Sequence, residues 1–450
     1  MKIPTSLVLF TTLSLHYPTN PLSITPTTQS SNIIRGSNKY GTDNNSTILT
    51  PVDAALKVGV RPTKEATKEE WQRAWKLHRF MMRPLHLGDG CRPKDSKLAL
   101  ACLWWKAISG NDSSSPVHDY SLSYDLLPPI TRWVVSRRVC RFYPRLHHAN
   151  VEIRTAYLDK ALTSVINTIM NEHNTVTQQN QPKKKKKKKI RLIVMGGGYD
   201  TRSIKLLEQS LLQQCDDDVP QYHLLQKRHN SLSRRRHWYH RLLPRRNNSN
   251  QNNNNDVTTT AKSAGNAFLN ITSTNYSLEA FELDLPEVVS AKRKLLSSRL
   301  FRRRSWLRLH TDQETTMVNN GEQRVEYPKL LEADFNDLNG TRKVLEGILS
   351  SDNGDDDVTN IVLFEGVMIY LDEGVPHALL QLCSEVLKKS VNSNATSSLG
   401  YLCFADRLDN IPGGDKDAAL VEMEGTGWEL VDFLSKPGLA RHMGVARVVR

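Results

Sequence analysis

The sequence predicts an α/β protein built on a doubly wound, mostly parallel sheet, and three observations predict it. The apolar segment Leu192–Met195 runs directly into three glycines, and a helical pattern follows from Ser203. Strand-like and helix-like segments then alternate to about residue 404. Two further strand-like segments come next, joined by a short link, which predicts an antiparallel hairpin. A strand, a glycine turn and a helix form the opening unit of a nucleotide-binding α/β domain.

The glycine turn has the spacing Gly196-x-Gly198-x-Asp200. Without a Cβ, these glycines let a ligand approach the backbone, although a plain tight turn would also explain them. The third glycine of a dinucleotide fingerprint is missing, which disfavours a nicotinamide enzyme and favours a smaller adenosyl ligand. We take Gly196, Gly198 and Asp200 as candidate cofactor-binding residues.

The chain of 450 residues divides by composition into segments that can and cannot bury a core. Residues 1–60 and 206–278 are polar and low in complexity, as expected for disordered chain. We therefore predict a cofactor-binding domain over 190–450, interrupted by the 206–278 insert, and an N-terminal helical lid over 66–170.

Residues 1–60 also carry a targeting-like pattern. A short apolar run follows Lys2, as in a signal peptide, and no acidic residue precedes Asp43, as in an organelle transit peptide. We expect a removable targeting segment and otherwise a cytoplasmic protein without a membrane span.

The net charge of +14 is concentrated in two segments. Lys183 to Lys189 supply seven positive charges, and residues 222–246 supply eight more with no acid among them. The basicity therefore belongs to inserts, and nucleic-acid binding is not expected as the main function because such runs are usually solvated. The six cysteines are scattered without metal-ligand spacing, so no metal site is expected.

The predicted lid contains two helix-like segments, Lys68 to Met82 and 151–169, and between them the apolar stretch Leu98 to Trp105. In the segment 151–169, one face is made by Leu158, Leu162, Val165 and Ile169. Arg154 lies four residues before Leu158 and therefore on the same inward face.

Beyond the turn, the strands and helices alternate as in a parallel sheet. The predicted strands are 191–195, 280–283, 328–333, 360–364 and 399–404, and the predicted helices are 287–300, 339–350 and 375–389. The terminal pair of strands covers 428–433 and 445–449. A hairpin at the end of an otherwise parallel sheet is typical of the class I methyltransferase fold.

Ligands of doubly wound sheets bind at the carboxyl ends of the strands, so acids at these ends are candidates. Asp284 is placed to accept both hydroxyls of a ribose, although with Glu287 it also forms a capping-box pattern. Asp334 is placed to accept an adenine amino group while Phe335 flanks the ring. The alternative is a polar turn in which Asp337 caps the next helix.

Glu365 ends a wholly apolar run, where a carboxylate must be paired or hydrogen-bonded. Arg154 poses the complementary problem on an apolar helix face. It could pair with Glu365 or with the carboxylate of an amino-acid-like ligand. The alternative is that its stem extends to water.

A ligand with adenine, ribose and a terminal carboxylate is S-adenosylmethionine, and these residues resemble the leucine carboxyl methyltransferases and related polyketide O-methyltransferases. The resemblance covers roughly residues 120–450 without the insert. It rests on "EIRTAYLDKAL" at 152–162, Gly196-x-Gly198-x-Asp200-Thr201-Arg202, "FELDLPEVVSAKRKLL" at 281–296, Asp334, and "FEGVMIYL" at 364–371. Two N-terminal segments, 92–112 and 142–161, resemble a plant and algal branch of this family.

The resemblance implies that the residues at Arg154, Gly196, Asp284, Asp334, Phe335 and Glu365 contact the cofactor. Phe335 departs from the family, in which leucine is usual, and so do the inserts.

We therefore expect an S-adenosylmethionine-dependent O-methyltransferase that acts on a carboxylate of a small molecule or a protein C-terminus. Carboxyl groups titrate near pH 4, so an ionised acceptor needs no general base. Tyr370 is a candidate lining residue of the acceptor pocket. The alternative from another class is a non-catalytic adenosyl- or RNA-binding protein that uses the basic inserts.

Overall fold

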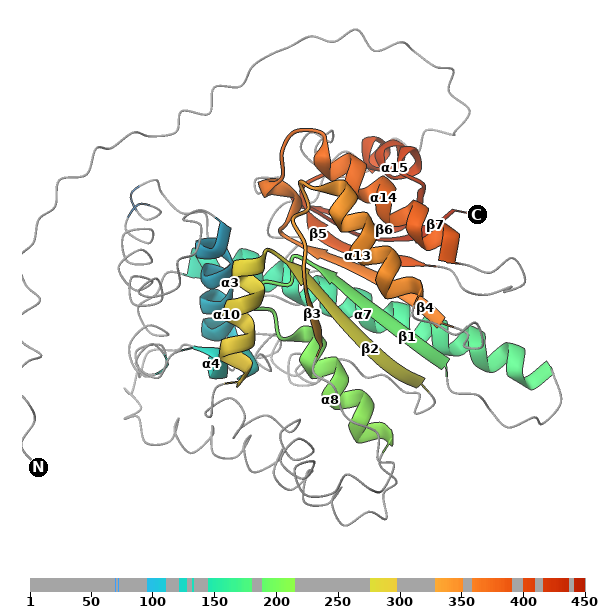
Figure 1. The fold of residues 1–450 in the computed structure, drawn as a ribbon, viewed down its shortest axis with the longest axis horizontal. Coiled ribbons are helices and arrows are strands. Elements are labelled where there is room, and N and C mark those ends of the chain that lie inside the picture. The colour runs from blue at the N-terminus through green and yellow to red at the C-terminus, as the bar shows by residue number, and fades with distance from the viewer. Residues whose placement is uncertain are drawn as a thin grey trace, which may run out of the picture. The chain divides into compact units, whose positions relative to one another are not determined.

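Seven strands form one sheet in the order β3-β2-β1-β4-β5-β7-β6 (Figure 1). The bounds are β1 Lys188–Met195, β2 Tyr276–Asp284, β3 Lys329–Glu332, β4 Val358–Glu365, β5 Tyr401–Asp406, β6 Trp428–Lys436 and β7 Arg441–Val448. The first five strands pair in parallel, and β7 pairs antiparallel with both β5 and β6. This mixed α/β sheet, mostly parallel, fits a Rossmann-like methyltransferase fold.

The helices connect these strands or precede them along the chain. Their bounds are α3 Asp95–Gly110, α4 Ser121–Leu126, α7 Arg145–Gln179, α8 Arg202–Gln214, α10 Pro286–Ser297, α13 Leu338–Ser350, α14 Val375–Ser390 and α15 Lys416–Gly425. A 3-10 helix, η5 Met368–Tyr370, follows β4. The computed structural model describes residues 95–110, 121–127, 145–179, 188–214, 276–297, 328–350, 358–390, 400–408, 416–436 and 441–449, with positions 69, 72 and 132.

The central strand β1 is buried on both faces, and its side chains alternate between two cores. Leu192 and Val194 pack in the core that contains α7, whereas Ile193 and Met195 pack in the core that contains α13 and α14. The order also places the switch point of the sheet between β1 and β4, because the chain moves outward from β1 in one direction and from β4 in the other. Doubly wound sheets bind ligands at this point.

The helix α7 covers one face of the sheet (Figure 1). The predicted stripe Leu158, Leu162, Val165 and Ile169 is buried against side chains of β1, β4, β5 and β7. A hydrogen bond adds to this contact, because the Tyr157 hydroxyl donates to Asp432 Oδ2 on β6 at 2.7 Å. Thus α7, which lies mostly within the segment predicted as a lid, packs along the sheet, while α3 and α4 pack on each other.

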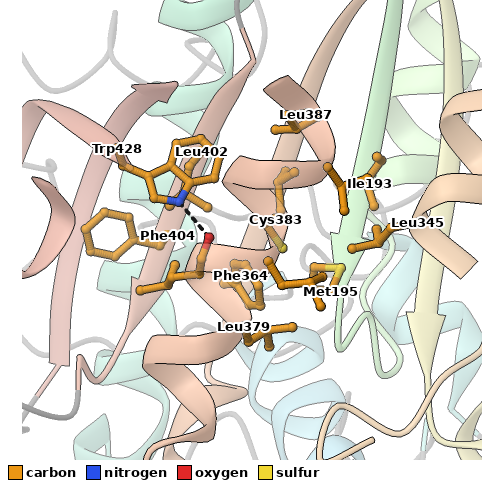
Figure 2. Close-up of a cluster of buried hydrophobic side chains, with 14 of the residues drawn as sticks. Ile193, Met195, Leu345, Phe364, Leu379, Cys383, Leu387, Leu402, Phe404 and Trp428 are labelled. Carbon is orange, nitrogen blue, oxygen red and sulfur yellow. Dashed lines mark hydrogen bonds between the residues drawn. The ribbon is translucent and has the colours of Figure 1, made fainter. Parts of the chain in front are cut away.

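The other face is covered by α13, α14 and α15 and holds the larger aromatic core. Figure 2 shows Phe364, Phe404 and Trp428 in this core beside Leu379 and Cys383 of α14. The Trp428 indole Nε1 donates to the Leu380 carbonyl at 2.9 Å, so its polar atom is satisfied without solvent.

Each predicted parallel strand is present, but β1, β2 and β7 begin three or four residues before their predicted starts, at Lys188, Tyr276 and Arg441. The insert predicted over 206–278 overlaps ordered structure at both ends: α8 extends to Gln214 because Leu206 and Leu207 are buried, and β2 begins at Tyr276, which is also buried. The lysine run predicted to belong to an insert reaches into β1, where Lys188 is buried and Lys189 pairs with Glu279 at 3.2 Å.

Several predictions fall wholly or mostly outside the described residues. These are the targeting segment 1–60, the basic segment 222–246, and the helix over Lys68 to Met82, of which only Glu69 and Gln72 are described, both helical. Among the helices that the structure describes, none combines the length and apolar character needed to cross a membrane.

Candidate functional site

A cavity lies where β1, β2, β3 and β4 end, next to the switch point of the sheet. It is lined by all the residues singled out in the sequence: Arg154, Gly196, Gly198, Asp200, Asp284, Asp334, Phe335, Glu365 and Tyr370. The helix α3 adds one wall, and η5 with the residues around it adds another. The structure thus brings together side chains that are separated by more than 200 positions in the chain, such as Arg154 and Glu365.

The glycine turn after β1 requires glycine for two different reasons. Gly196 has φ +66° and Gly198 has φ +47°, a left-handed backbone that other residues rarely adopt. A Cβ on Gly196 would also lie 2.2 Å from Val367 Cγ2. The turn is therefore packed against the segment that follows β4, and its three glycines line the cavity.

Asp284 joins the end of β2 to this turn. Its Oδ2 accepts a hydrogen bond from the Gly198 amide at 2.6 Å, and its Oδ1 accepts one from the Leu285 amide at 2.8 Å. Burial raises the pKa of the Asp284 carboxyl to about 6, although both amides act in the opposite direction. A carboxylate so placed faces the cavity and titrates close to neutral pH.

The loop after β3 presents one exposed and one buried side chain. Asp334 is exposed and its Oδ1 accepts the Asn336 amide at 3.1 Å, whereas Phe335 is buried in the aromatic core. Asp337 caps α13, as the alternative interpretation expects, because its Oδ1 accepts the Gly340 amide at 3.0 Å. Both aspartates thus shape the turn, and Asp334 also reaches the cavity.

The Glu365 side chain is only 6% exposed and is paired with three cations. Its Oε1 accepts Arg154 Nε at 2.9 Å, and its Oε2 accepts Lys106 Nζ at 2.9 Å and Arg202 Nη1 at 3.0 Å. Burial alone would raise the pKa of Glu365, but Lys106, Arg202 and Arg154 outweigh it and hold the pKa well below the ordinary value. Glu365 is therefore a carboxylate at neutral pH.

Arg154 is only 6% exposed, so its stem does not carry the guanidinium to bulk water. Its Nε donates to Glu365 and its Nη2 donates to Cys102 Sγ at 3.0 Å. Of the alternatives for this arginine, the structure shows the pair with Glu365.

Two further carboxylates complete the charge network around Arg202. Asp159 Oδ1 accepts Arg202 Nε at 2.7 Å, and Asp200 pairs with Arg202 and, at 3.2 Å, with Lys106. Burial would raise the pKa of Asp200, but Arg202 and Lys106 lower it. Three cations (Lys106, Arg154 and Arg202) thus face three carboxylates (Asp159, Asp200 and Glu365), and the formal charges of these six groups balance.

A second buried ion pair contacts the glycine turn. Lys292 of α10 pairs with Glu282 of β2, which also accepts the Ser203 hydroxyl. The same ammonium donates to the Asp200 carbonyl at 2.6 Å, and a Cβ on Gly197 would lie 3.1 Å from Glu282 Oε2. These contacts of Lys292 and Glu282 therefore fix the position of the glycine turn relative to β2.

The sequence interpretation missed Lys106 and the face of α3 that carries it. Ala99, Cys102, Leu103 and Lys106 all line the cavity, at the spacing of one helix face. The available signal was a lysine that continues an apolar stripe immediately after Trp104 and Trp105.

Comparisons with known proteins add little to this geometry. No family profile and no curated protein matches the sequence. Among solved structures, LepI in complex with SAM is 8% identical with a TM-score of 0.24, over 58% of this chain and 43% of that one. A LepI variant with SAH and a substrate analogue is 8% identical with a TM-score of 0.24, over 61% and 46%. A protein described as a pericyclic reaction enzyme is 9% identical with a TM-score of 0.25, over 85% and 100%. The chain thus spans less than half the length of the two LepI chains, and the fold assignment rests on the strand order.

Proposed function

We propose that the protein is an S-adenosylmethionine-dependent O-methyltransferase that transfers a methyl group to a carboxylate. One observation carries the proposal: the residues predicted to bind adenine, ribose and an amino-acid group all line a single cavity at the switch point of the sheet. The sequence resemblance to the leucine carboxyl methyltransferases and their polyketide O-methyltransferase relatives points to the same function.

The adenosyl end of the ligand is assigned to the ends of β2 and β3. Asp284 would accept the ribose hydroxyls, since its carboxylate is fixed beside the glycine turn. Asp334 would accept the adenine amino group, and Phe335 would flank the ring. Gly196 and Gly198 would allow the ligand to lie against the backbone.

The amino-acid end is assigned to the buried charge network. Lys106 and Arg154 supply donors for a ligand carboxylate, and Asp200 and Glu365 supply acceptors for its ammonium group. A zwitterion adds one charge of each sign, so the balanced network accepts it without gaining net charge. This balance favours a ligand with an amino-acid end over an adenosyl ligand that carries only a carboxylate.

A carboxylate acceptor fits the cavity because it needs no proton transfer. When bound, S-adenosylmethionine supplies a methyl group whose bond to sulfur breaks as an acceptor oxygen attacks, leaving a neutral ester and a thioether. The residues described along the cavity include no histidine, Asp200 and Glu365 are already paired with cations, and Asp284 is bound by two backbone amides and assigned to the ribose hydroxyls. The protein's contribution is then alignment of the two reactants and removal of water from both charges.

The acceptor wall is assigned to Tyr370 and to the lid predicted over 66–170, in which α3 lines the cavity. Tyr370 is 43% exposed at the cavity, so a substrate can reach it from outside. A small molecule or a flexible protein C-terminus both present an accessible carboxylate to such a rim.

Calorimetry with S-adenosylhomocysteine tests the cofactor assignment. We expect binding by the wild type, and weaker binding by about tenfold or more in Asp284→Ala and in Glu365→Ala. Glu429→Ala is the matched control, because this carboxylate is exposed and does not line the cavity. Absent binding, or binding equal in all variants, contradicts the proposal.

The acceptor class is tested with tritium-labelled S-adenosylmethionine and fractionated cell extract. We expect label in a fraction from which mild base releases it as methanol, as a carboxyl methyl ester requires. A base-stable label would leave the cofactor assignment intact and contradict the carboxylate acceptor.

A further inference from the structure

The segment that follows β4 makes one wall of the cavity. The chain leaves Glu365, turns at Gly366 with φ +69°, and enters the 3-10 helix η5. Four of its residues line the cavity: Gly366, Val367, Tyr370 and Leu371. The position of this turn, residues 366–371, decides where Tyr370 lies relative to the glycine turn.

The first amides of η5 need acceptors from outside the helix, because a helix leaves its initial N–H groups unpaired. Val367, at the N-cap, makes no side-chain capping bond. Asp406, the last residue of β5, supplies the acceptor instead. Its Oδ2 accepts the Val367 amide at 2.5 Å and the Met368 amide at 3.0 Å.

Asp406 is 0% exposed, and its other oxygen also accepts a backbone amide, that of Arg407 at 2.9 Å. Because β4 and β5 pair with Glu365 opposite Ala405, Asp406 lies one residue beyond this pair, directly beside the turn. The backbone bond from the Gly366 amide to the Ala405 carbonyl, at 3.1 Å, completes the attachment. A carboxylate that accepts buried amides fixes their position more strongly than a neutral group does.

We propose that Asp406 is a positioning residue for methyl transfer, which acts by holding the 366–371 turn and with it the acceptor side of the cavity. This rests on the proposed function. One contact carries the effect of Asp406 to the acceptor side of the cavity: the Tyr370 amide donates a hydrogen bond to the Val367 carbonyl at 3.0 Å. The far end of the turn is fixed separately, because the Asp372 amide donates to Asn336 Oδ1 at 3.0 Å.

The chemical consequence of losing this carboxylate is specific. Asp406→Ala leaves the Val367 and Met368 amides buried without their acceptor, so the turn has to move to satisfy them. Tyr370 then moves with it, whereas Asp284, Asp334 and the charge network stay anchored by their own bonds. A shift of about 1 Å in one reactant can lower a transfer rate by about 100-fold.

The test measures three properties of the full-length protein: the environment of Tyr370, the affinity for S-adenosylhomocysteine and the rate of methyl transfer. Fluorotyrosine is placed at position 370, and fluorine NMR reports its environment in wild type, Asp406→Ala and Asp406→Asn. The asparagine variant keeps one oxygen acceptor but loses the charge. Asp432→Asn is the matched control, since its carboxylate accepts a Tyr157 hydroxyl outside the cavity lining.

For Asp406→Ala, we expect the fluorotyrosine resonance to shift or split and the affinity for S-adenosylhomocysteine to stay within about threefold of wild type. The transfer of tritium from S-adenosylmethionine into the cell-extract fraction should be lower by about 10- to 100-fold. Asp406→Asn should lie between this variant and wild type in both resonance and rate, and Asp432→Asn should match wild type. An unchanged resonance, or affinity and transfer that fall by the same factor, would overturn the proposal. If the alanine variant does not fold, a wild-type resonance in Asp406→Asn overturns it equally. Failure of the proposed function is distinct, because the wild type would then bind no S-adenosylhomocysteine.

Discussion

The surroundings of Asp284 raise the pKa of its carboxyl group toward the physiological pH range. Burial raises its pKa from 3.8 to about 6. Above about pH 6 the group is mostly ionised and, in the proposed site, would accept hydrogen bonds from ribose hydroxyls; below about pH 6 it is mostly protonated. Cofactor affinity should therefore rise as pH increases through about 6, and the pH dependence should follow this one group.

We predict that S-adenosylhomocysteine binds about tenfold more weakly at about pH 5 than at about pH 7, since only a tenth of Asp284 is then ionised. Isothermal calorimetry across this range measures the effect. Asp284→Asn should bind weakly at every pH, and Asp337→Asn should keep the wild-type profile. A pH dependence that survives in Asp284→Asn would assign the titration to another group.

Lys106 lies between two carboxylates of the network, at 3.2 Å from Asp200 and 2.9 Å from Glu365. If it also holds the ligand carboxylate, its loss should matter only for ligands that have one. We predict that Lys106→Met weakens S-adenosylhomocysteine binding by about 10- to 100-fold and weakens methylthioadenosine binding much less. Competition binding with the two ligands measures the difference, and Lys106→Arg should restore most of it.

Single charged residues in apolar surroundings were the most predictable part of the site. A lone acid after an apolar strand has to be paired, which identified Glu365, and Arg154 followed from the same reasoning. Lys106 was not predicted as a site residue, because a lysine at the edge of an apolar helix normally extends its ammonium group to water. Only the tertiary contact between α3 and the end of β4 shows that it does not.

At the scale of elements, the connection from β1 to α8 depends on glycine at Gly196. A side chain there meets both an unfavourable φ and Val367 at 2.2 Å. We predict that Gly196→Ala lowers the free energy of unfolding by about 1–3 kcal/mol and abolishes measurable cofactor binding.

Thermal and urea unfolding measure this loss, and Gly347→Ala is the matched control. Gly347 lies in α13, and a Cβ added to it would meet no atom within 4 Å, so alanine should stabilise the helix by about 0.5–1 kcal/mol. Equal effects at the two glycines would show that the turn tolerates a side chain.

The parallel strands were predictable because each is a short apolar run that ends at a polar residue. Chain order alone does not give the position of the last strand in the sheet, because β7 follows β6 in the chain but lies between β5 and β6 in the sheet. The extent of β1 was also missed, because composition alone does not show that Lys188 is buried and Lys189 paired. Burial and pairing of a lysine depend on residues such as Glu279, which lie far away in the chain.

At the scale of the molecule, the ordered ends of α8 and β2 define which part of the insert can be removed. We predict that replacing residues 215–275 by a short Gly/Ser linker leaves S-adenosylhomocysteine affinity within about threefold of wild type, because the residues that the structure describes along the cavity all lie outside this segment. Calorimetry and thermal unfolding of the shortened protein measure this. Loss of a nucleic-acid interaction, together with absent methyl transfer in both proteins, would instead favour a non-catalytic binding protein.

The insertion of β7 between β5 and β6 has a consequence for the order of folding. Because β6 has no direct partner in β5, it cannot join the sheet until residues 441–448 are available to bridge the two. Completion of the sheet during synthesis therefore waits for its last strand to leave the ribosome. A chain truncated before Arg441 should leave the β7-facing edge of β5 unpaired, and pulse-labelling hydrogen exchange should find that β6 acquires protection no earlier than β7.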